Sequence, residues 1–120
     1  RGAQKLSAQG INTVALPGTI DLDIACTEYT IGFDTAVNTA MQAIDKIRDS
    51  STSHERCSII EVMGRNAGYI ALWCGIASGA EDILIPERFD GNRPKLENEL
   101  IESILEKKAL GKKHHLIINA

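Results

Sequence analysis

The chain lacks the features that would assign it to several specialised classes of protein. Its 120 residues contain no apolar run long enough to cross a membrane, and its start does not resemble a signal peptide. The formal net charge is only −3, which argues against general nucleic-acid binding. No internal repeat or low-complexity tract is present. The composition therefore predicts at most one domain with a modest core, no membrane contact and no nucleic-acid partner.

Cysteine is scarce, and its spacing fits neither a disulfide framework nor a metal site. Cys26, Cys57 and Cys74 are odd in number, widely spaced and form no C-x-x-C pair. Reduced structural thiols are the favoured interpretation, with a metal or disulfide role as the alternative. We therefore expect a cytoplasmic protein.

Natural chain ends are also lacking. There is no initiator methionine, and the chain stops at Ala120, at the edge of the apolar run at residues 116–118. A buried strand rarely ends a protein without a short tail. We therefore expect this chain to be a fragment of a longer one.

Short β-branched runs alternate with helical patterns. The runs at residues 13–16, 58–62, 82–85 and 116–118 predict buried strands. Alternating strands and helices predict an α/β fold with a parallel sheet.

Four helices are expected, at residues 2–9, from 33 to beyond 47, at 67–78 and at 94–109. The long second helix carries one apolar stripe, which is formed by Phe33, Val37, Ala40, Ile44 and Ile47. The third is apolar nearly all round, which predicts burial, and Gly79 is placed to end it. The fourth is expected to turn Leu96, Leu100, Ile101 and Leu105 inward, with Gly111 as its stop.

The most informative segment is P-G-T-I-D-L-D at residues 17–23, directly after the predicted strand at 13–16. In an extended loop alternate side chains share a face, so Thr19, Asp21 and Asp23 are predicted to point into one cleft. A hydroxyl and two carboxylates at a strand end suit Mg²⁺-assisted phosphoryl transfer. One carboxylate takes a proton from the attacking hydroxyl and the other helps hold the metal. The alternative is an ordinary turn, in which a D-x-D sequence is common.

The remainder of the chain adds long and specific motifs, which follow one another in order. After residues 17–23 come T-E-Y-T-I-G-F-D-T-A at 27–36, A-I-D-K-I-R-D at 43–49, S-H-E-R at 53–56 and E-V-M-G-R at 61–65. Together they closely resemble the middle of ATP-dependent 6-phosphofructokinases of the bacterial type. The resemblance runs nearly end to end and is weakest over residues 88–107.

The resemblance implies the three-layer α/β/α phosphofructokinase fold, incomplete in this chain. Residues 1–30 would be a remnant of the ATP-binding domain with the catalytic loop. Residues 31–120 would be part of the sugar-phosphate-binding and effector domain. The implied reaction transfers the γ-phosphoryl group of ATP to the 1-hydroxyl of fructose 6-phosphate, giving fructose 1,6-bisphosphate and ADP in glycolysis.

The resemblance also implies roles in catalysis. Asp21 would accept the proton of the 1-hydroxyl, and Thr19 would donate a hydrogen bond to the transferring phosphoryl group. Asp23 would hold Mg²⁺ through water, because Mg²⁺ keeps much of its hydration shell. Arg65 would pair with the catalytic carboxylate or a phosphate oxygen; a solvated surface charge is the alternative. A turn or helix-capping residue is the alternative for Asp21.

Further residues would bind the sugar phosphate. Gly64 would let the backbone approach it, and Met63 would pack on the sugar. Arg56 would contact the 6-phosphate held by a neighbouring subunit, which implies a homo-oligomer, expected to be a tetramer in the parent enzyme.

Four residues match an effector site for a nucleotide diphosphate with Mg²⁺ or for phosphoenolpyruvate. They are Arg48, Gly79, Glu81 and Lys112. Cations would hold phosphate oxygens while the carboxylate takes the metal. The alternative is that the basic residues around Lys112 only offset a helix dipole.

Single positions bear on the donor and on departures from the family pattern. Gly18 favours ATP, because pyrophosphate-dependent relatives carry lysine there. Leu22 stands where asparagine is usual, Cys26 where glycine is usual and Tyr69 where aspartate is expected.

By the same resemblance, a glycine-rich ATP-binding segment would precede Arg1, and further sugar-phosphate ligands would follow Ala120. We therefore expect the isolated fragment to be inactive. The alternatives are a pyrophosphate-dependent phosphofructokinase and a non-catalytic module that binds phosphorylated ligands.

Overall fold

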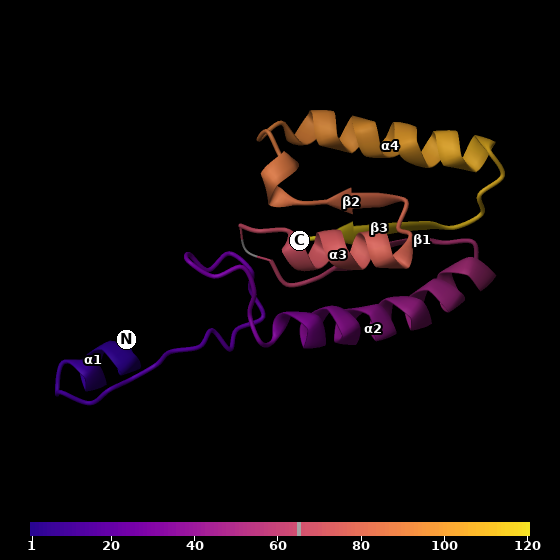
Figure 1. The fold of residues 1–120 in the computed structure, drawn as a ribbon. Coiled ribbons are helices and arrows are strands. Elements are labelled where there is room, and N and C mark those ends of the chain that lie inside the picture. Colours follow the sequence, from indigo (N-terminus) through magenta and orange to yellow (C-terminus); the bar gives the residue numbers. More distant parts are fainter. Residues whose placement is uncertain (65) are drawn as a thin grey trace.

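The computed structural model describes residues 1–64 and 66–120, which form helices and a parallel sheet (Figure 1). The predicted α/β class is therefore confirmed. In chain order the elements are α1 (Gly2–Ser7), α2 (Phe33–Ser53), β1 (Cys57–Glu61), α3 (Tyr69–Ser78), β2 (Asp82–Leu84), the 3₁₀ turn η1 (Pro86–Arg88), α4 (Arg93–Ala109) and β3 (His115–Asn119).

The last strand of the described chain lies in the middle of the sheet. The strand order is β1-β3-β2, and both pairings are parallel. Cys57 pairs with His115 at one end of β1, and Glu61 pairs with Asn119 at the other. Because the strands are parallel, their carboxyl ends share one edge of the sheet and their amino ends share the opposite edge.

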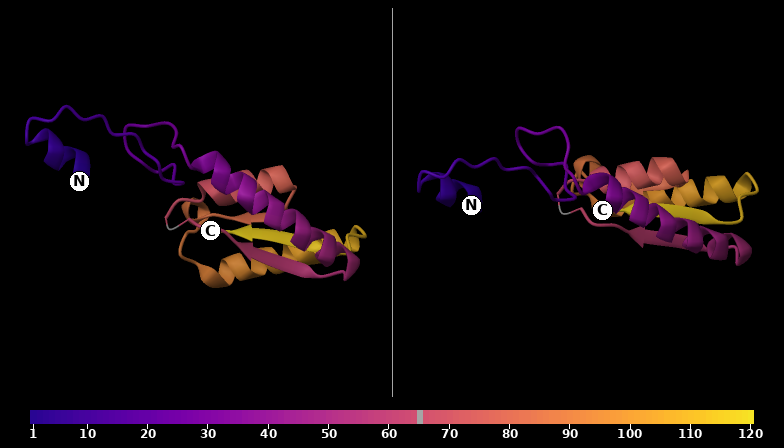
Figure 2. Two further views of the ribbon diagram at one scale, coloured as in Figure 1. Left: turned by 90° about the horizontal axis from the view of Figure 1, so that it is seen from below. Right: turned by 60° about the horizontal axis from the view of Figure 1, so that its bottom comes forward.

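Helices cover the two faces of the sheet (Figures 1 and 2). The helices α2 and α3 pack on one face, and α4 lies over the other. Leu116 and Ile118 of β3 join the core on the α2–α3 side, and Ile117, which points to the opposite face, is also buried. The buried core consists of Phe33, Ile44, Ile70, Ala71, Cys74, Leu116 and Ile118.

The stripe predicted for α2 packs as expected along most of its length. Phe33 and Ile44 are fully buried, and Val37 and Ala40 pack against the same core. Ile47 is 39% exposed and lies outside the buried part of the stripe. None of the described helices combines the length and the apolarity that are needed to span a bilayer.

The strand predicted at residues 13–16 is wrong. Val14 is 90% exposed and Leu16 is 74% exposed, and the segment has no regular structure. A strand needs a neighbouring strand for its backbone hydrogen bonds, and no strand pairs with these residues in the described chain. Residues 1–16 instead project away from the sheet (Figures 1 and 2).

Two predictions of helix burial also need correction. In α3 only one face is buried, and Trp73 and Ile76 on the outer face are 54% and 69% exposed. The apolar composition of α3 predicted burial all round, but the described chain covers only the side facing α2 and the sheet. In α4, Ile101 and Leu105 are 54% and 59% exposed rather than inward-facing. The partly buried residues of α4 are Leu96, Leu100, Ser103, Ile104 and Lys107, so its inner face combines apolar side chains with a polar cluster, which is described below.

The helix α3 lies very close to the segment that contains β2. A Cβ atom on Gly75 would lie 2.5 Å from side-chain atoms of Ile83, and one on Gly68 would lie 2.4 Å from Cβ of Ile85. Gly79 ends the helix in the left-handed conformation, with φ of 65°, as predicted. Small residues at 68 and 75 therefore let the backbone of α3 approach the sheet edge.

We expect Gly68→Ala to destabilise the fold by about 1–3 kcal/mol, because the added methyl group must displace the branched Cβ of Ile85. Chemical denaturation followed by circular dichroism would measure the loss. Gly2→Ala is the matched control, since a Cβ there meets nothing within 4 Å. Equal stability of the two variants would contradict the close approach.

Candidate functional site

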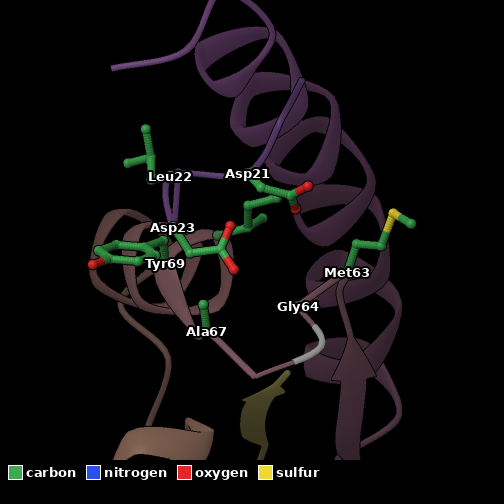
Figure 3. A pocket seen from close by; sticks show the side chains of 8 residues that line it. Asp21, Leu22, Asp23, Met63, Gly64, Ala67 and Tyr69 are labelled. Carbon is green, nitrogen blue, oxygen red and sulfur yellow. The ribbon is translucent and has the colours of Figure 1, made fainter. Parts of the chain in front are cut away.

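A cavity of about 240 Å³ opens at the carboxyl edge of the sheet (Figure 3). Ligands of open parallel sheets bind outside the carboxyl ends of the strands, so the location itself favours a binding site. The loop at residues 21–23, the turn that follows β1 and the start of α3 enclose the cavity. The lining residues are Asp21, Leu22, Asp23, Met63, Gly64, Ala67, Tyr69 and Ile70.

Both predicted carboxylates line this cavity, but the predicted hydroxyl does not. The side chains of Asp21 and Asp23 extend from one loop toward the hollow (Figure 3). Thr19 instead donates a hydrogen bond from Oγ1 to Oδ2 of Asp21 at 2.9 Å. The segment bends at residues 19, 20 and 22 rather than running extended, so the three side chains do not share one face. In this structure Thr19 therefore positions Asp21.

Backbone hydrogen bonds hold the loop against the start of α2. The amide of Ile31 donates to the carbonyl of Pro17 at 3.0 Å, and the amide of Gly32 donates to the carbonyl of Thr19 at 3.1 Å. A Cβ atom on Gly32 would lie only 3.0 Å from that Thr19 oxygen and 3.1 Å from the carbonyl oxygen of Gly18. Glycine at position 32 thus allows the loop to approach the start of α2 closely. This contact fixes the position of the loop that carries Asp21 and Asp23.

The turn after β1 also depends on glycine. A Cβ atom on Gly64 would lie 2.6 Å from the carbonyl oxygen of Ala67, so a larger residue would force the turn open. Met63 lines the cavity and is 73% exposed, which leaves its side chain available to a ligand. Arg65, the third residue of this predicted motif, lies outside the described residues.

The donors around the cavity fit a water-coordinated magnesium ion. Among residues 1–64 and 66–120, no group of three or more His, Cys, Asp or Glu side chains is arranged to hold a metal. Mg²⁺ does not need such a cage, since one or two carboxylates with water and substrate phosphates suffice. Asp23, with Asp21 beside it in the same cavity, provides that kind of partial ligand set.

The residues that depart from the family pattern have definite structural roles. Leu22 lines the cavity and also packs against the core, so it anchors the loop by apolar contact. Cys26 has a φ of 65°, in the left-handed region that favours glycine, so its backbone conformation is strained for a residue with a side chain. Tyr69 lines the cavity at the first turn of α3. All three cysteines are free thiols, and only Cys74 is buried.

Arg56 is not brought to the cavity. Its amide donates to the carbonyl of Ser51 at 2.9 Å, and its carbonyl accepts from the amide of His115 at 3.2 Å. These bonds place Arg56 just before β1, at the amino edge of the sheet. The structure thus separates Arg56 from Asp21 within one chain.

The predicted effector residues gather at this amino edge. The guanidinium of Arg48 donates a hydrogen bond to the carbonyl of Ser78, the last residue of α3 before Gly79. Two residues further on, Oε1 of Glu81 pairs with Nζ of Lys112 at 2.7 Å. Residues from α2, α3 and the loop before β3 therefore meet at the edge opposite the cavity.

Glu81 is held in its charged form. Its side chain is only 4% exposed, and Oε2 accepts a hydrogen bond from the amide of Leu116 at 2.8 Å. Burial raises the pKa of Glu81, but the bonds from Lys112 and from the Leu116 amide outweigh that effect and keep the pKa below its ordinary value.

Sequence reasoning missed a second polar group at the same edge. Asp82, Ser103, Lys107 and His115 form a hydrogen-bonded set between α4 and the sheet, which we call the Asp82 cluster. Ser103 and Lys107 are four residues apart and so share a helix face, which was an available signal. Their partners in β2 and β3 become visible only in the fold.

Comparison with known proteins identifies the family of the chain. Residues 1–120 match the family model described as phosphofructokinase. An ATP-dependent 6-phosphofructokinase of Brevibacillus brevis is 57% identical over 120 residues, which is 100% of this chain and 36% of that relative. An enzyme of the same description from Clostridium botulinum (strain Hall) is 59% identical over 119 residues, covering 99% of this chain and 36% of the relative. The chain thus spans 36% of the length of these relatives.

Solved structures agree with this match. Phosphofructokinase from Saccharomyces cerevisiae superposes with a TM-score of 0.82 at 39% identity, covering 88% of this chain and 14% of that one. Pichia pastoris phosphofructokinase in the T-state superposes with a TM-score of 0.75 at 28% identity, covering 87% of this chain and 11% of that one.

The lowered pKa of Glu81 predicts a pH-dependent contribution to stability. Because the folded-state pKa lies below the ordinary value of 4.5, the contribution is fully present above pH 4.5 and is lost as the pH falls through the folded-state pKa. Glu81→Gln should therefore cost about 1–3 kcal/mol of unfolding free energy at pH 7 and progressively less below pH 4.5. Denaturant unfolding across this range is the measurement, with the exposed Glu102→Gln as control. If the difference in unfolding free energy between Glu81→Gln and the original protein stayed constant with pH, it would contradict the lowered pKa of Glu81.

Proposed function

This chain belongs to the phosphofructokinase family, and from that premise we propose that it forms part of an ATP-dependent 6-phosphofructokinase of glycolysis. The whole protein would transfer the γ-phosphoryl group of ATP to the 1-hydroxyl of fructose 6-phosphate in the cytoplasm. The observation that carries the proposal is the cavity in which Asp21 and Asp23 lie beside the Met63–Gly64 turn. The activity belongs to the whole protein, and we expect none from the 120 residues alone.

In the proposed reaction Asp21 acts as the base. Its carboxylate accepts the proton of the sugar 1-hydroxyl, whose oxygen then forms a bond to the γ-phosphorus as the bond from phosphorus to the ADP oxygen breaks. The hydrogen bond from Thr19 supports this role, since it orients Oδ2 of Asp21. Positioning matters more than basicity here, because phosphoryl transfer depends mainly on alignment and charge stabilisation.

The remaining roles concern the metal and the substrate. Asp23 would hold Mg²⁺ through water, and the ion, when bound, would neutralise charge on the phosphates. The close turn at Gly64 would bring backbone groups to the sugar phosphate, and Met63 would pack on the sugar. Arg65 would pair with the catalytic carboxylate or a phosphate oxygen.

We also propose an oligomer and an effector site. Arg56, which lies at the edge opposite the cavity, would serve the sugar 6-phosphate of a neighbouring subunit in a homotetramer. Arg48, Gly79, Glu81 and Lys112 would bind a nucleotide diphosphate with Mg²⁺, or phosphoenolpyruvate. The pairing of Glu81 with Lys112 and the contact of Arg48 beside Gly79 support this assignment.

We expect Asp21→Ser in the full-length protein to lower kcat by about 10²–10⁴-fold. The serine hydroxyl is a much weaker base than the aspartate carboxylate and does not take the proton from the sugar 1-hydroxyl. A coupled assay of ADP release with fructose 6-phosphate, ATP and Mg²⁺ would measure it. Glu28→Gln in the same exposed loop region is the control and should retain activity. Full turnover by the Asp21→Ser variant would contradict the assignment of Asp21 as the base. No turnover by the unmodified full-length protein with either ATP or pyrophosphate would instead favour a non-catalytic, ligand-binding module.

The donor can be tested at Gly18, where a Cβ atom would meet nothing within 4 Å. Because the position is open, Gly18→Lys should fold normally and place a cation where the extra phosphate of ATP would sit. We expect kcat/KM for ATP to fall about tenfold or more, or about 1.4 kcal/mol of transition-state stabilisation. Gly18→Ala is the matched control and should use ATP normally. Unchanged ATP use by the lysine variant, or turnover of the original protein with pyrophosphate alone, would count against the ATP assignment.

A further inference from the structure

The Asp82 cluster lies between α4 and the amino edge of the sheet. Oδ2 of Asp82 lies 2.6 Å from Nε2 of His115 and 3.3 Å from Nζ of Lys107, and the hydroxyl of Ser103 is 3.0 Å from both carboxylate oxygens. Lys107 also donates to Oγ of Ser103 at 2.9 Å. The cluster joins β2, β3 and α4 through side chains alone.

Lys107 also contacts a residue outside the Asp82 cluster. Its Nζ donates to the backbone carbonyl of Glu81 at 2.6 Å, the shortest of its three bonds. The side chain of Lys107 is only 25% exposed, so the ammonium group is removed from much of its water and depends on these acceptors. The bond links α4 to the backbone of Glu81, the residue whose carboxylate belongs to the proposed effector site.

Every polar group of Glu81 is engaged. Its amide donates to the carbonyl of Leu116 at 2.9 Å, and its Oε2 accepts from the amide of the same residue at 2.8 Å. Oε1 pairs with Lys112, and the carbonyl is taken by Lys107. Three of these bonds come from β3 and the loop before it, whereas the fourth comes from α4. Removing Lys107 would therefore free the backbone carbonyl of Glu81, while its amide and its carboxylate keep their hydrogen bonds.

We propose that Lys107, held by Asp82 and Ser103, is a positioning residue that fixes the backbone of Glu81 and thereby sets its carboxylate for the effector site. Glu81 would then present Oε1 at a constant place, where Lys112 and an incoming metal-bound diphosphate compete for it. Partners that orient a metal ligand commonly change its affinity by about 10–100-fold when they are lost. The effect on effector response rests on the effector site proposed above, whereas the positioning of Glu81 itself does not.

The packing of α4 supports this role over a simple attachment of the helix. Ile101 and Leu105 are more than half exposed, whereas Ser103 and Lys107 of the same helix face the sheet. Leu96, Leu100 and Ile104 of this helix are partly buried and already attach it by apolar contact, which carries no desolvation cost. Lys107 adds a hydrogen-bond donor for the backbone carbonyl of Glu81, which the apolar residues cannot supply.

The test compares Lys107→Met with the original residue in the full-length protein. Hydrogen exchange at the Leu116 amide, resolved by mass spectrometry with fragmentation, reports the bond to Oε2 of Glu81 without any ligand. We expect exchange at Leu116 to quicken about tenfold, while the Ile118 amide in the same strand stays unchanged. Lys95→Met is the matched control, since that lysine of α4 pairs with Asp90 in an exposed loop.

Two results would overturn the positioning of Glu81. One is unchanged exchange at Leu116 in Lys107→Met. The other is an equal rise at Leu116 and Ile118, which would mean that the lysine only attaches the helix. Should Lys107→Met fail to fold, Ser103→Ala removes a single hydroxyl and should produce a smaller rise of about threefold, again at Leu116 only.

The effector response is measured separately with ADP and Mg²⁺ at subsaturating fructose 6-phosphate. In Lys107→Met we expect the half-maximal ADP concentration to rise about tenfold with kcat unchanged. An unchanged half-maximal concentration would overturn the link to the effector. If the original protein shows no response to ADP and Mg²⁺, the proposed effector site fails, and exchange at Leu116 still decides whether Lys107 positions Glu81.

Discussion

The parallel pairing of β3 between β1 and β2 is the constraint on which the rest of this structure depends. The strand is buried on both faces, and its backbone supplies hydrogen bonds to both neighbours. It fixes the register that places Glu61, Leu84 and Asn119 at one edge. The same register places the reciprocal bonds between Leu116 and Glu81 near the other edge. A shift of β3 would disturb both edges together.

The carboxyl edge and the amino edge of the sheet are held in place by different interactions. At the carboxyl edge, close backbone approach at Gly32 and Gly64 shapes a cavity whose carboxylates face solvent and can receive a ligand. At the amino edge, the buried carboxylate of Glu81 is paired with Lys112, whose side chain is 52% exposed. Removing one partner of such a pair leaves an uncompensated charge, so this edge tolerates substitution poorly. The proposed phosphoryl-transfer site needs access, and the proposed effector site needs a defined resting arrangement.

The sequence was most predictive where a local pattern determines the structure. The β-branched runs gave β1, β2 and β3 within two residues, and the glycine at position 79 ended α3 as expected. The candidate carboxylates Asp21 and Asp23 were found because a loop after a predicted strand suggested them, although that strand does not form. Prediction failed where the outcome depends on distant partners. Residues 13–16 have no strand beside them in the described chain, and the Asp82 cluster unites residues up to 33 positions apart.

The outer face of α3 has a practical consequence for spectroscopy. Trp73 is the single tryptophan of the chain, and it lies on that face with its ring edge-on to Phe33 at 6.1 Å. Since the indole is about half exposed, its emission depends on whatever lies against this surface. One native fluorophore therefore reports on the covering of α3, without any label, while its contact with Phe33 makes it sensitive to the start of α2 as well.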